Sequence, residues 1–347
     1  MLFLYGTATA SFFIGALVAE KVDKARFLFI WVSIGAVFSF LPLLMRLSCE
    51  PEITIFLVLF GIIFGIGLPP CLALIPALTK IEERGKIGGA IACLTFFLLP
   101  LFLMSVESSS YSNFLFAGIW RAVGLFAFLI RAKKEIDVPQ RVSYSFVVEK
   151  RFLFYFLPWL MFCIINQFEI QIFTSFIGEQ FVQNLMLVEF TAGSIFCFVG
   201  GWMMDFKGRR PTIIAGLVTL GMGYTVLSLF PAASLAQVFY LLADGAAWGI
   251  FTTAFVFVIW GDIAGDMRAE KFYALGYIPY FIVYILSAYF APVLASVEVR
   301  SAFSLAAFFI FLAIIPLFFA PELLPERVLK EREIKKYVEE AKKVAQR

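Results

Sequence analysis

The chain carries eleven apolar runs, each long enough to cross a membrane, separated by short polar segments. They lie at residues 2–19, 27–46, 53–78, 87–105, 113–130, 152–177, 185–204, 211–230, 235–261, 272–295 and 301–319. A run of roughly 20 apolar residues spans the hydrocarbon core as an α-helix, because a helix satisfies its backbone polar groups within the segment. With 62% apolar and 15% charged residues, the composition excludes a soluble globular domain. The sequence therefore predicts an all-α, multi-pass membrane protein.

Basic residues are divided unequally between the two sides on which successive loops alternate. One side holds 25 of the 28 Lys and Arg residues, and the other holds only Arg46 and Arg300. The remaining one, Arg121, falls inside an apolar run. Loops rich in Lys and Arg stay in the cytoplasm. We therefore expect a cell-membrane protein whose C-terminus is cytoplasmic.

Several classes of site are excluded by residue type. The sequence contains no histidine, which removes His-based metal sites and Ser-His-Asp or Cys-His catalysis. The cysteines lack metal-ligand spacing, and all but the first lie inside apolar runs: Cys49, Cys71, Cys93, Cys163 and Cys197. No nucleotide-binding motif is present, and the net charge of +3 reflects the cytoplasmic loops. We expect no enzyme activity, no metal, no cofactor and no nucleic-acid partner.

Two apolar runs are joined by a short loop in which an acidic residue precedes basic ones between glycines. This loop, residues 200–211, resembles the signature of the major facilitator superfamily of secondary transporters: Gly, any three residues, Asp, Arg or Lys, any residue, Gly, Arg, then Arg or Lys. The matching residues are Gly201, Asp205, Gly208, Arg209 and Arg210. Phe206 replaces the usual base after the acid, and Lys207 follows one place late. A generic basic stop after a spanning helix would need neither glycine nor the acid.

The two parts of the chain are related by an internal repeat. A shift of 185 residues superposes Gly15 on Gly200, Glu20 on Asp205 and Lys24 on Arg209. A shift of 184 superposes Gly61 on Gly245, Gly65 on Gly249 and Arg84 on Arg268. These coincidences predict two parallel halves. The resembled family has such halves, with the substrate site near the midplane between them.

The repeat also predicts the domain boundaries. Residues 1–131 form a first half of five helices, 132–151 a cytoplasmic linker, 152–320 a second half of six helices, and 321–347 a cytoplasmic tail. Within the linker, residues 137–140 favour an extended chain because of Pro139. At the repeat spacing, the partner of the second half's first helix begins about 33 residues before Met1. The first family helix is therefore expected to be missing, through a late start codon, a truncated gene or a genuine eleven-helix form. We rank these causes in that order and predict an in-frame apolar segment upstream.

The family resemblance implies a gate and a cavity. In the family the signature Asp docks on the N-terminus of the eleventh helix, which here begins just after Arg268, and locks the outward-facing state. Asp205 takes that role here, and Gly201 and Gly208 allow close backbone approach. In the first half Glu20 keeps the acid and Lys24 the base, but Asp23 occupies the second glycine's place, so we expect a weaker or altered gate. In family order, the helices at 53–78, 152–177 and 235–261 line the cavity.

Ionisable residues inside a membrane are costly and are functional candidates. Arg121, Glu169 and Asp244 lie at similar distances from the outer ends of their runs, so we expect one depth and possible pairing. Because the helix of Arg121 is peripheral in the family, a structural ion pair is favoured there over substrate contact. A free acid is the better proton coupler, since a permanent cation would hold it charged. Asp244 is therefore assigned coupling or substrate binding, and Glu169 substrate recognition or pairing with Arg121.

Two polar patterns surround these acids. One is a cluster at 166–171, consisting of Asn166, Gln167, Glu169 and Gln171, which either binds substrate or simply forms a wet end of the helix. The other is a stripe at four-residue spacing, consisting of Asp244, Trp248 and Thr252, which either lines a cavity or packs helices.

The function indicated is a monomeric secondary transporter that moves a small solute by alternating access in the lipid bilayer, coupled to a proton or another cation. The alternative is a non-transporting membrane scaffold or receptor descended from a transporter, supported by the missing helix and the altered first gate. In the tail, residues 321–325 resemble a Pro-Glu-Thr-Leu-Pro segment of some family members, with Leu in place of Thr. Beyond it an apolar stripe predicts an amphipathic helix, or more plainly a solvated helix with ion pairs: Val328, Ile334, Val338, Ala341 and Ala345.

Overall fold

The computed structural model describes residues 2–44, 50–106, 110–130, 143–328, 330, 331, 334 and 338. The first half contains α1 Leu2–Ala19, α2 Lys24–Leu44, α3 Glu50–Leu72, α4 Leu74–Leu78, α5 Arg84–Val106 and α6 Ser110–Ile130. The second contains the 3-10 helix η1 Tyr144–Val148, α7 Lys150–Ile177, α8 Glu179–Lys207, α9 Arg209–Leu229, α10 Ser234–Phe251, the π-helix η2 Thr252–Val258, α11 Ile259–Ala264, α12 Glu270–Leu294, α13 Val299–Leu312 and α14 Ile315–Phe319. Every apolar run is helical over most of its described residues, and no strand occurs in the described part of the chain, which confirms the all-α prediction.

Nine helices or helix pairs in the described part of the chain are long and apolar enough to cross a membrane. The other two predicted spans correspond to α5 and α6, of which α6 contributes a shorter apolar stretch at Phe114–Phe126. Three runs depart from a single uninterrupted α-helix. The run at 53–78 breaks between α3 and α4, just after Pro69 and Pro70, and the last run breaks between α13 and α14. The run at 235–261 continues from α10 through a seven-residue π-helix into α11.

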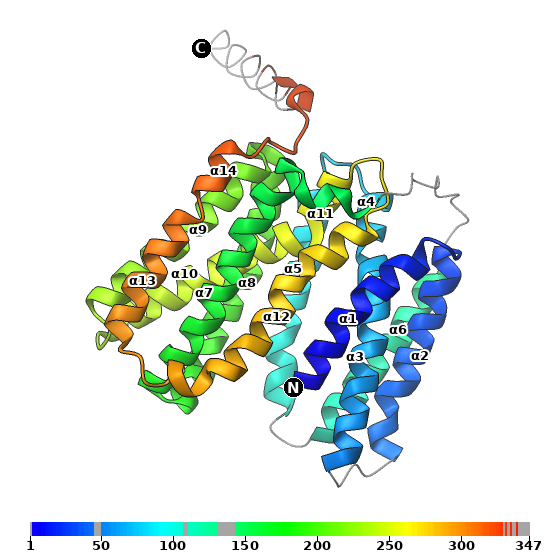
Figure 1. Cartoon of the computed structure of the whole chain (residues 1–347), viewed down its shortest axis with the longest axis horizontal. Helices are drawn as coiled ribbons and strands as arrows, with labels where there is room; N and C mark the ends of the chain where they lie inside the picture. Colours follow the sequence, from blue (N-terminus) through cyan, green and yellow to red (C-terminus); the bar gives the residue numbers. More distant parts are fainter. Residues whose placement is uncertain are drawn as a thin grey trace.

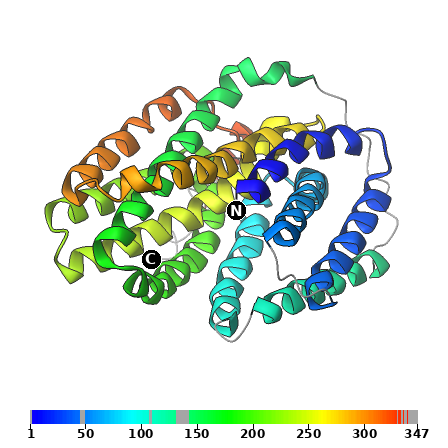
Figure 2. The ribbon, with the colours of Figure 1, turned by 60° about the horizontal axis from the view of Figure 1, so that its bottom comes forward.

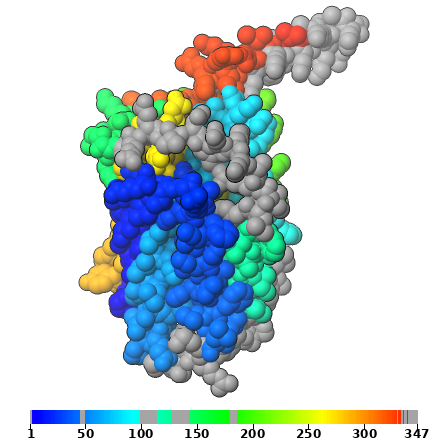
Figure 3. Space-filling model, turned by 90° about the vertical axis from the view of Figure 1, so that its right-hand side faces the viewer, coloured from blue at the N-terminus to red at the C-terminus, as the bar shows by residue number. Residues whose placement is uncertain are grey.

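The helices form two side-by-side groups, α1 to α6 and α7 to α14 (Figure 1). Two helix pairs make the largest contacts between the groups: α1 lies beside α12, as Figure 2 shows, and α5 lies beside α8. Smaller contacts join α5 to η2 and α3 to α12. We call the end of the bundle that carries the Lys- and Arg-rich loops the basic end. The C-terminal segment extends away from this end (Figure 3). The linker between the groups lies mostly outside the described residues, and Pro139 is among those not described.

Close backbone approach at glycines holds α5 against α8. A side chain added at Gly89 would place its Cβ 2.5 Å from the carbonyl oxygen of Cys197, and Gly201 meets the backbone of Gly85 in the same way. Small residues allow membrane helices to approach this closely, and dispersion contacts then stabilise the pair. The contact between α1 and α12 is made instead by aromatic side chains: Phe12 packs edge-on against Phe281, with ring centroids 4.9 Å apart.

The second half contains the larger buried aromatic core. Its fully buried side chains include Tyr155, Phe162, Phe173, Tyr224, Tyr240, Phe251 and Trp260. Before α7, the segment at 143–149 packs onto the base of α12, where Phe146 stacks on Phe272 with ring centroids 3.8 Å apart. The expected linker therefore ends in a docked 3-10 turn, and α7 begins at Lys150.

The tail is helical at its described residues from Glu326 onward and bears exposed ion pairs at i,i+4 spacing. Arg327 Nε lies 2.8 Å from Glu331, and Lys330 Nζ lies 3.3 Å from Glu326. Such exposed pairs contribute little to stability. Ala341 and Ala345, which belong to the predicted apolar stripe, lie outside the described residues, as does Cys49.

Candidate functional site

Asp205 lies in the last turn of α8 and caps a helix of the other half. Its Oδ1 accepts a hydrogen bond from the backbone N–H of Gly85 at 2.9 Å, and its Oδ2 accepts one from Lys86 N–H at 2.7 Å. These N–H groups belong to the first turn of α5, where they have no partner within the helix and carry its partial positive charge. A fully buried carboxylate is thus satisfied by the end of a helix across the interface.

The prediction that Asp205 docks on the helix after Arg268 is wrong. That helix is α12, and it lies beside α1, whereas α8 lies beside α5. The reason is the symmetry of the repeat: a loop signature in the second half faces a first-half helix. Glu20, the repeat partner of Asp205, does reach α12.

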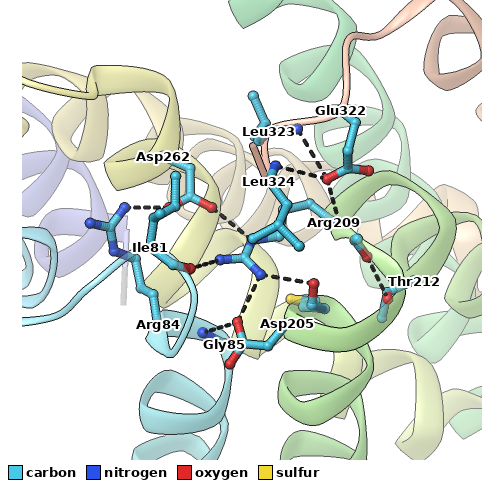
Figure 4. A network of polar contacts seen from close by, with 12 residues as sticks. Ile81, Arg84, Gly85, Asp205, Arg209, Thr212, Asp262, Glu322, Leu323 and Leu324 are labelled. Atoms are coloured by element: carbon cyan, nitrogen blue, oxygen red, sulfur yellow. Dashed lines mark hydrogen bonds and ion pairs between the residues drawn. The ribbon is translucent and has the colours of Figure 1, made fainter. Parts of the chain in front are cut away.

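Arg209 ties three elements together at the basic end (Figure 4). Its Nη1 donates to Asp205 Oδ1 at 2.8 Å, and its Nε donates to Asp262 Oδ2 at 2.7 Å. The other oxygen of Asp262 accepts a hydrogen bond from Arg84 Nη1 of α5. Arg209 Nη2 also donates to the carbonyl of Ile81. Two acids and two arginines therefore form a buried network between the halves, which we call the interface lock.

Asp262 is a member of the interface lock that sequence reasoning missed. It lies on α11, at the basic end of the run ending at 261, and is 1% exposed. An acid at this position looks like the first residue of a polar loop. The clue was a count of charges. Arg84 and Arg209 both approach the interface, and Asp205 alone can neutralise only one of them, so a second acid is required.

A second carboxylate caps the helix that follows the loop signature. Glu322 accepts hydrogen bonds from the backbone N–H groups of Arg209 at 2.7 Å and Arg210 at 3.0 Å, the first residues of α9. The Arg210 side chain donates to the carbonyl of Ala320. Gly208 separates α8 from α9 with φ of +108°, a conformation that side chains disfavour, and a Cβ there would also meet the Glu322 carboxylate.

The first half makes the corresponding contact with α12. Glu20 Oε1 lies 2.8 Å from Lys271 Nζ, and Lys24 Nζ lies 2.7 Å from Glu270. Lys271 follows Lys86 by 185 residues, the same shift that relates Asp205 to Glu20. We call these two ion pairs the first-half lock. Both ion pairs end on residues in the first turn of α12.

The end of the linker packs against the first-half lock. The ring of Tyr144 lies 5.0 Å from Lys271 Nζ, within the range of a cation–π contact. Burial and the negative charge of Glu20 raise the pKa of the Tyr144 hydroxyl, so this group stays neutral and protonated at physiological pH.

A second set of polar side chains lies inside the second half and shares no residue with the interface lock. Asn166 of α7 donates from Nδ2 to Asp244 Oδ1 of α10 at 2.8 Å, and its Oδ1 accepts from Trp248 Nε1 at 3.1 Å. Glu169 accepts a hydrogen bond from the Tyr240 hydroxyl, while its Oε2 has no partner among the described residues. Asn166, Glu169 and Asp244 are 5%, 2% and 2% exposed. The sequence-predicted polar cluster and stripe therefore meet, with Asn166 between them.

Glu189 of α8 adds a third acid that sequence reasoning missed. The charges of Glu189 and Glu169 both act on Asp244. The backbone of Glu189 passes close to Gly245, which allows α8 to approach α10. The signal was available, because Glu189 is an acid inside the apolar run 185–204. We call Glu169, Glu189 and Asp244 the acid cluster.

The expected pairing of Arg121 with Glu169 or Asp244 is wrong. Arg121 lies on α6 in the other half, where Nη1 donates to the carbonyl of Gly35 and to Ser39 Oγ, both at 2.9 Å. Its guanidinium also lies 5.1 Å from the ring centroid of Phe60. A similar depth along two helices does not bring their residues together when those helices lie in different halves.

The remaining predicted residues lie at the edges of these groups. Gln167 and Gln171 are half-buried on α7, and Thr252 is half-buried at the start of η2. A surface hollow of about 410 Å³ lies at the end opposite the basic end, lined by residues such as Ile172, Pro231 and Arg300. It contains none of the predicted site residues. The described residues include no cluster of acids and cysteines arranged to hold a metal ion.

Comparison with known proteins establishes the fold. No protein-family model and no curated protein matches the sequence. Among solved structures, the crystal structure of the human organic anion transporter MFSD10 (TETRAN) matches with a TM-score of 0.69 and 13% sequence identity. The match covers 91% of this chain and 83% of that one. The chain therefore has the major facilitator fold, as its loop signature predicted.

Proposed function

We propose that this chain, a multi-pass protein with the major facilitator fold, is a secondary transporter that moves a small solute across the membrane by alternating access. The observation that carries the proposal is the pair of locks at the basic end. Asp205 joins α8 to α5, and Glu20 joins α1 to α12, at positions related by the repeat. Two halves that are fastened by charged contacts at one end can separate there when those contacts break.

The locks define which side is closed. The positive-inside rule makes the basic end cytoplasmic, so intact locks correspond to a state closed toward the cytoplasm. Breaking them exposes buried charges, which is unfavourable unless water replaces the lost partners. Opening the basic end supplies that water. Both locks therefore act as reversible latches whose breaking accompanies the inward-facing state.

We further propose that the acid cluster couples transport to a proton or another cation. The groups that act on Asp244 include two further acids, and burial of several negative charges is unfavourable unless a proton or cation neutralises them. Asp244 and Asp262 lie on one continuous helical element, α10 through η2 to α11. Neutralisation at Asp244 thus has a direct mechanical connection to the interface lock. π-helical segments such as η2 often occur at functional sites.

The alternative is a membrane scaffold or receptor derived from a transporter. It was suggested by the altered signature of the first half, where Asp23 replaces a glycine. The ion pairs of Glu20 and Lys24 with α12 favour transport, because a scaffold has no need of two matched, separable contacts. The solute and its charge are left to experiment; the organic anion in the comparison belongs to that other protein.

Transport is tested with purified protein in liposomes. A mixture of small metabolites is presented with and without an imposed pH gradient, and accumulated compounds are identified by mass spectrometry. We expect at least one compound to accumulate in a gradient-dependent manner. The double variant Asp205→Asn with Lys271→Gln, which weakens both locks, serves as the impaired control. Absence of accumulation together with unchanged conformational exchange in this variant would support the scaffold.

A further inference from the structure

Trp248 occupies the boundary between the acid cluster and the contact between halves. It follows Asp244 by four residues and so lies on the same face of α10. Its ring meets Tyr280 of α12 edge-on at 6.2 Å between centroids. Tyr280 contacts Tyr284, which stacks on Tyr5 of α1 at 4.9 Å. A shift of the Trp248 ring therefore acts on the aromatic contact between the two halves.

Asn166 is the only hydrogen-bonded link described between Trp248 and Asp244. The orientation of its amide is fixed by chemistry, because an indole N–H can only donate. The amide oxygen must face Trp248, and the amide nitrogen must then face Asp244. Asp244 Oδ1 is consequently an acceptor in this arrangement.

A proton on Asp244 Oδ1 is incompatible with this arrangement. The protonated oxygen becomes a donor and requires the amide oxygen of Asn166, which Trp248 already occupies. If the amide turns to accept from Asp244, the indole N–H loses its partner. The Tyr224 hydroxyl oxygen accepts from the same amide nitrogen at 3.4 Å, so it too lies on the side of Asn166 that faces Asp244.

We propose that Asn166 is a proton-operated switch: its amide oxygen accepts from Trp248 when Asp244 is ionised, and from Asp244 when Oδ1, the oxygen that faces Asn166, carries the proton. Protonation thereby releases the Trp248 ring at the contact with α12. The inference rests on the proposed proton uptake by Asp244, and it adds the route by which uptake reaches the other half. The titratable groups that face Asp244 are Glu169 of α7, Glu189 of α8, Tyr224 of α9 and Tyr240 of α10 itself.

The test follows two signals in the purified protein as the pH is lowered, and it needs no substrate. Tryptophan fluorescence reports the environment of the indole, and the infrared carbonyl band of a protonated carboxyl reports proton uptake. Two variants separate the effects: Trp248→Phe keeps an aromatic ring but removes both the donor and the indole fluorophore, and Asn166→Leu keeps the fluorophore but removes its acceptor. The matched control for Trp248→Phe is Trp159→Phe, because Trp159 of α7 donates its indole N–H to the Gly276 carbonyl, away from the acid cluster.

We expect the parent protein to show a fluorescence change with the same midpoint as the carboxyl band. Both signals should disappear in Asp244→Asn. Trp248→Phe and Asn166→Leu should lose the fluorescence change and keep the carboxyl band, and Trp159→Phe should keep both. Size-exclusion chromatography and circular dichroism establish that each variant is folded.

Two results distinguish the possible failures. A parent protein without a carboxyl band that depends on Asp244 overturns proton coupling itself. A normal band with a fluorescence change that survives Trp248→Phe overturns the switch alone, since the proton then settles without displacing the indole. A fluorescence change that persists in folded Asn166→Leu would likewise overturn the switch and leave proton coupling in place.

Discussion

Asp205 accepts a hydrogen bond of 2.9 Å from the backbone N–H of Gly85, a residue 120 positions earlier in the chain and in the other half of the bundle. Both groups are buried, and the carboxylate is shared with Arg209. A hydrogen bond of this kind is strong while water is excluded. Once water enters, water molecules can take the place of either partner. The predictions below follow from this and from the related contacts.

Asp205→Asn should open the contact between α5 and α8 more often, because one charge-assisted acceptor is lost. Hydrogen bonds to charged groups contribute about 1.5–3 kcal/mol, which corresponds to a roughly tenfold or greater rise in the open population. The native Cys197 of α8 reports this, since it is buried against α5. Its alkylation rate, followed by mass spectrometry, should rise by that factor. Cys163, buried within the second half, should not change.

The matched control for this variant is Glu331→Gln, which removes an exposed acid that pairs with Arg327 on the tail, away from the contact between α5 and α8. The Cys197 rate should then equal that of the parent. Equal rates in Asp205→Asn and in the parent would contradict the lock.

Reversing one charge of the first-half lock should weaken it, and reversing both should restore it. Lys271→Glu places an acid beside Glu20, whereas Glu20→Lys with Lys271→Glu recreates the pair in the opposite sense. Cys71 of α3, which lies near Tyr277 of α12, provides the thiol reporter. We expect faster alkylation in the single variants and recovery in the double variant. A double variant as fast as the singles would mean that the pair contributes no coupling.

Arg209→Lys should destabilise the protein although the charge is kept. A lysine presents one compact ammonium group and cannot reach Asp205, Asp262 and two backbone carbonyls together. Each hydrogen bond to a charged group that is lost costs about 1.5–3 kcal/mol. Thermal unfolding in detergent should show a clear decrease. Arg210→Lys, at a half-buried neighbour with one carbonyl partner, should change stability much less.

The two acids of the cluster should differ in transport. Once a solute is known, Asp244→Asn should abolish gradient-driven accumulation and leave solute exchange measurable, because a permanently neutral group cannot carry a proton. Glu169→Gln should mainly alter solute affinity. If Asp244→Asn accumulates solute like the parent and Glu169→Gln does not, the two roles are reversed.

Orientation in the membrane can be tested at Cys49, which the sequence places between α2 and α3 on the side with almost no basic residues. A membrane-impermeant thiol reagent should label it in intact cells. Labelling that occurs only after permeabilisation would reverse the proposed orientation.

The sequence by itself determined the spans, the two halves and the residues of the loop signature. Hydrophobic run length and the repeat are local or regularly spaced features, and the membrane leaves a long apolar run no alternative to a helix. It also marked Asn166, Glu169, Asp244 and Trp248, since polar groups inside apolar runs stand out one by one.

Only the tertiary structure decided which of these residues meet. Asp205 reaches α5 and not α12, Arg121 stays with α2, and Asn166 joins Asp244 to Trp248. Position along a helix gives depth in the membrane, but partners across an interface depend on which helices lie side by side and how each is rotated. Asp262 and Glu189 could not be assigned from the sequence for the same reason. One lies at the end of an apolar run and the other within one, and only helix packing shows which charged residues surround each of them.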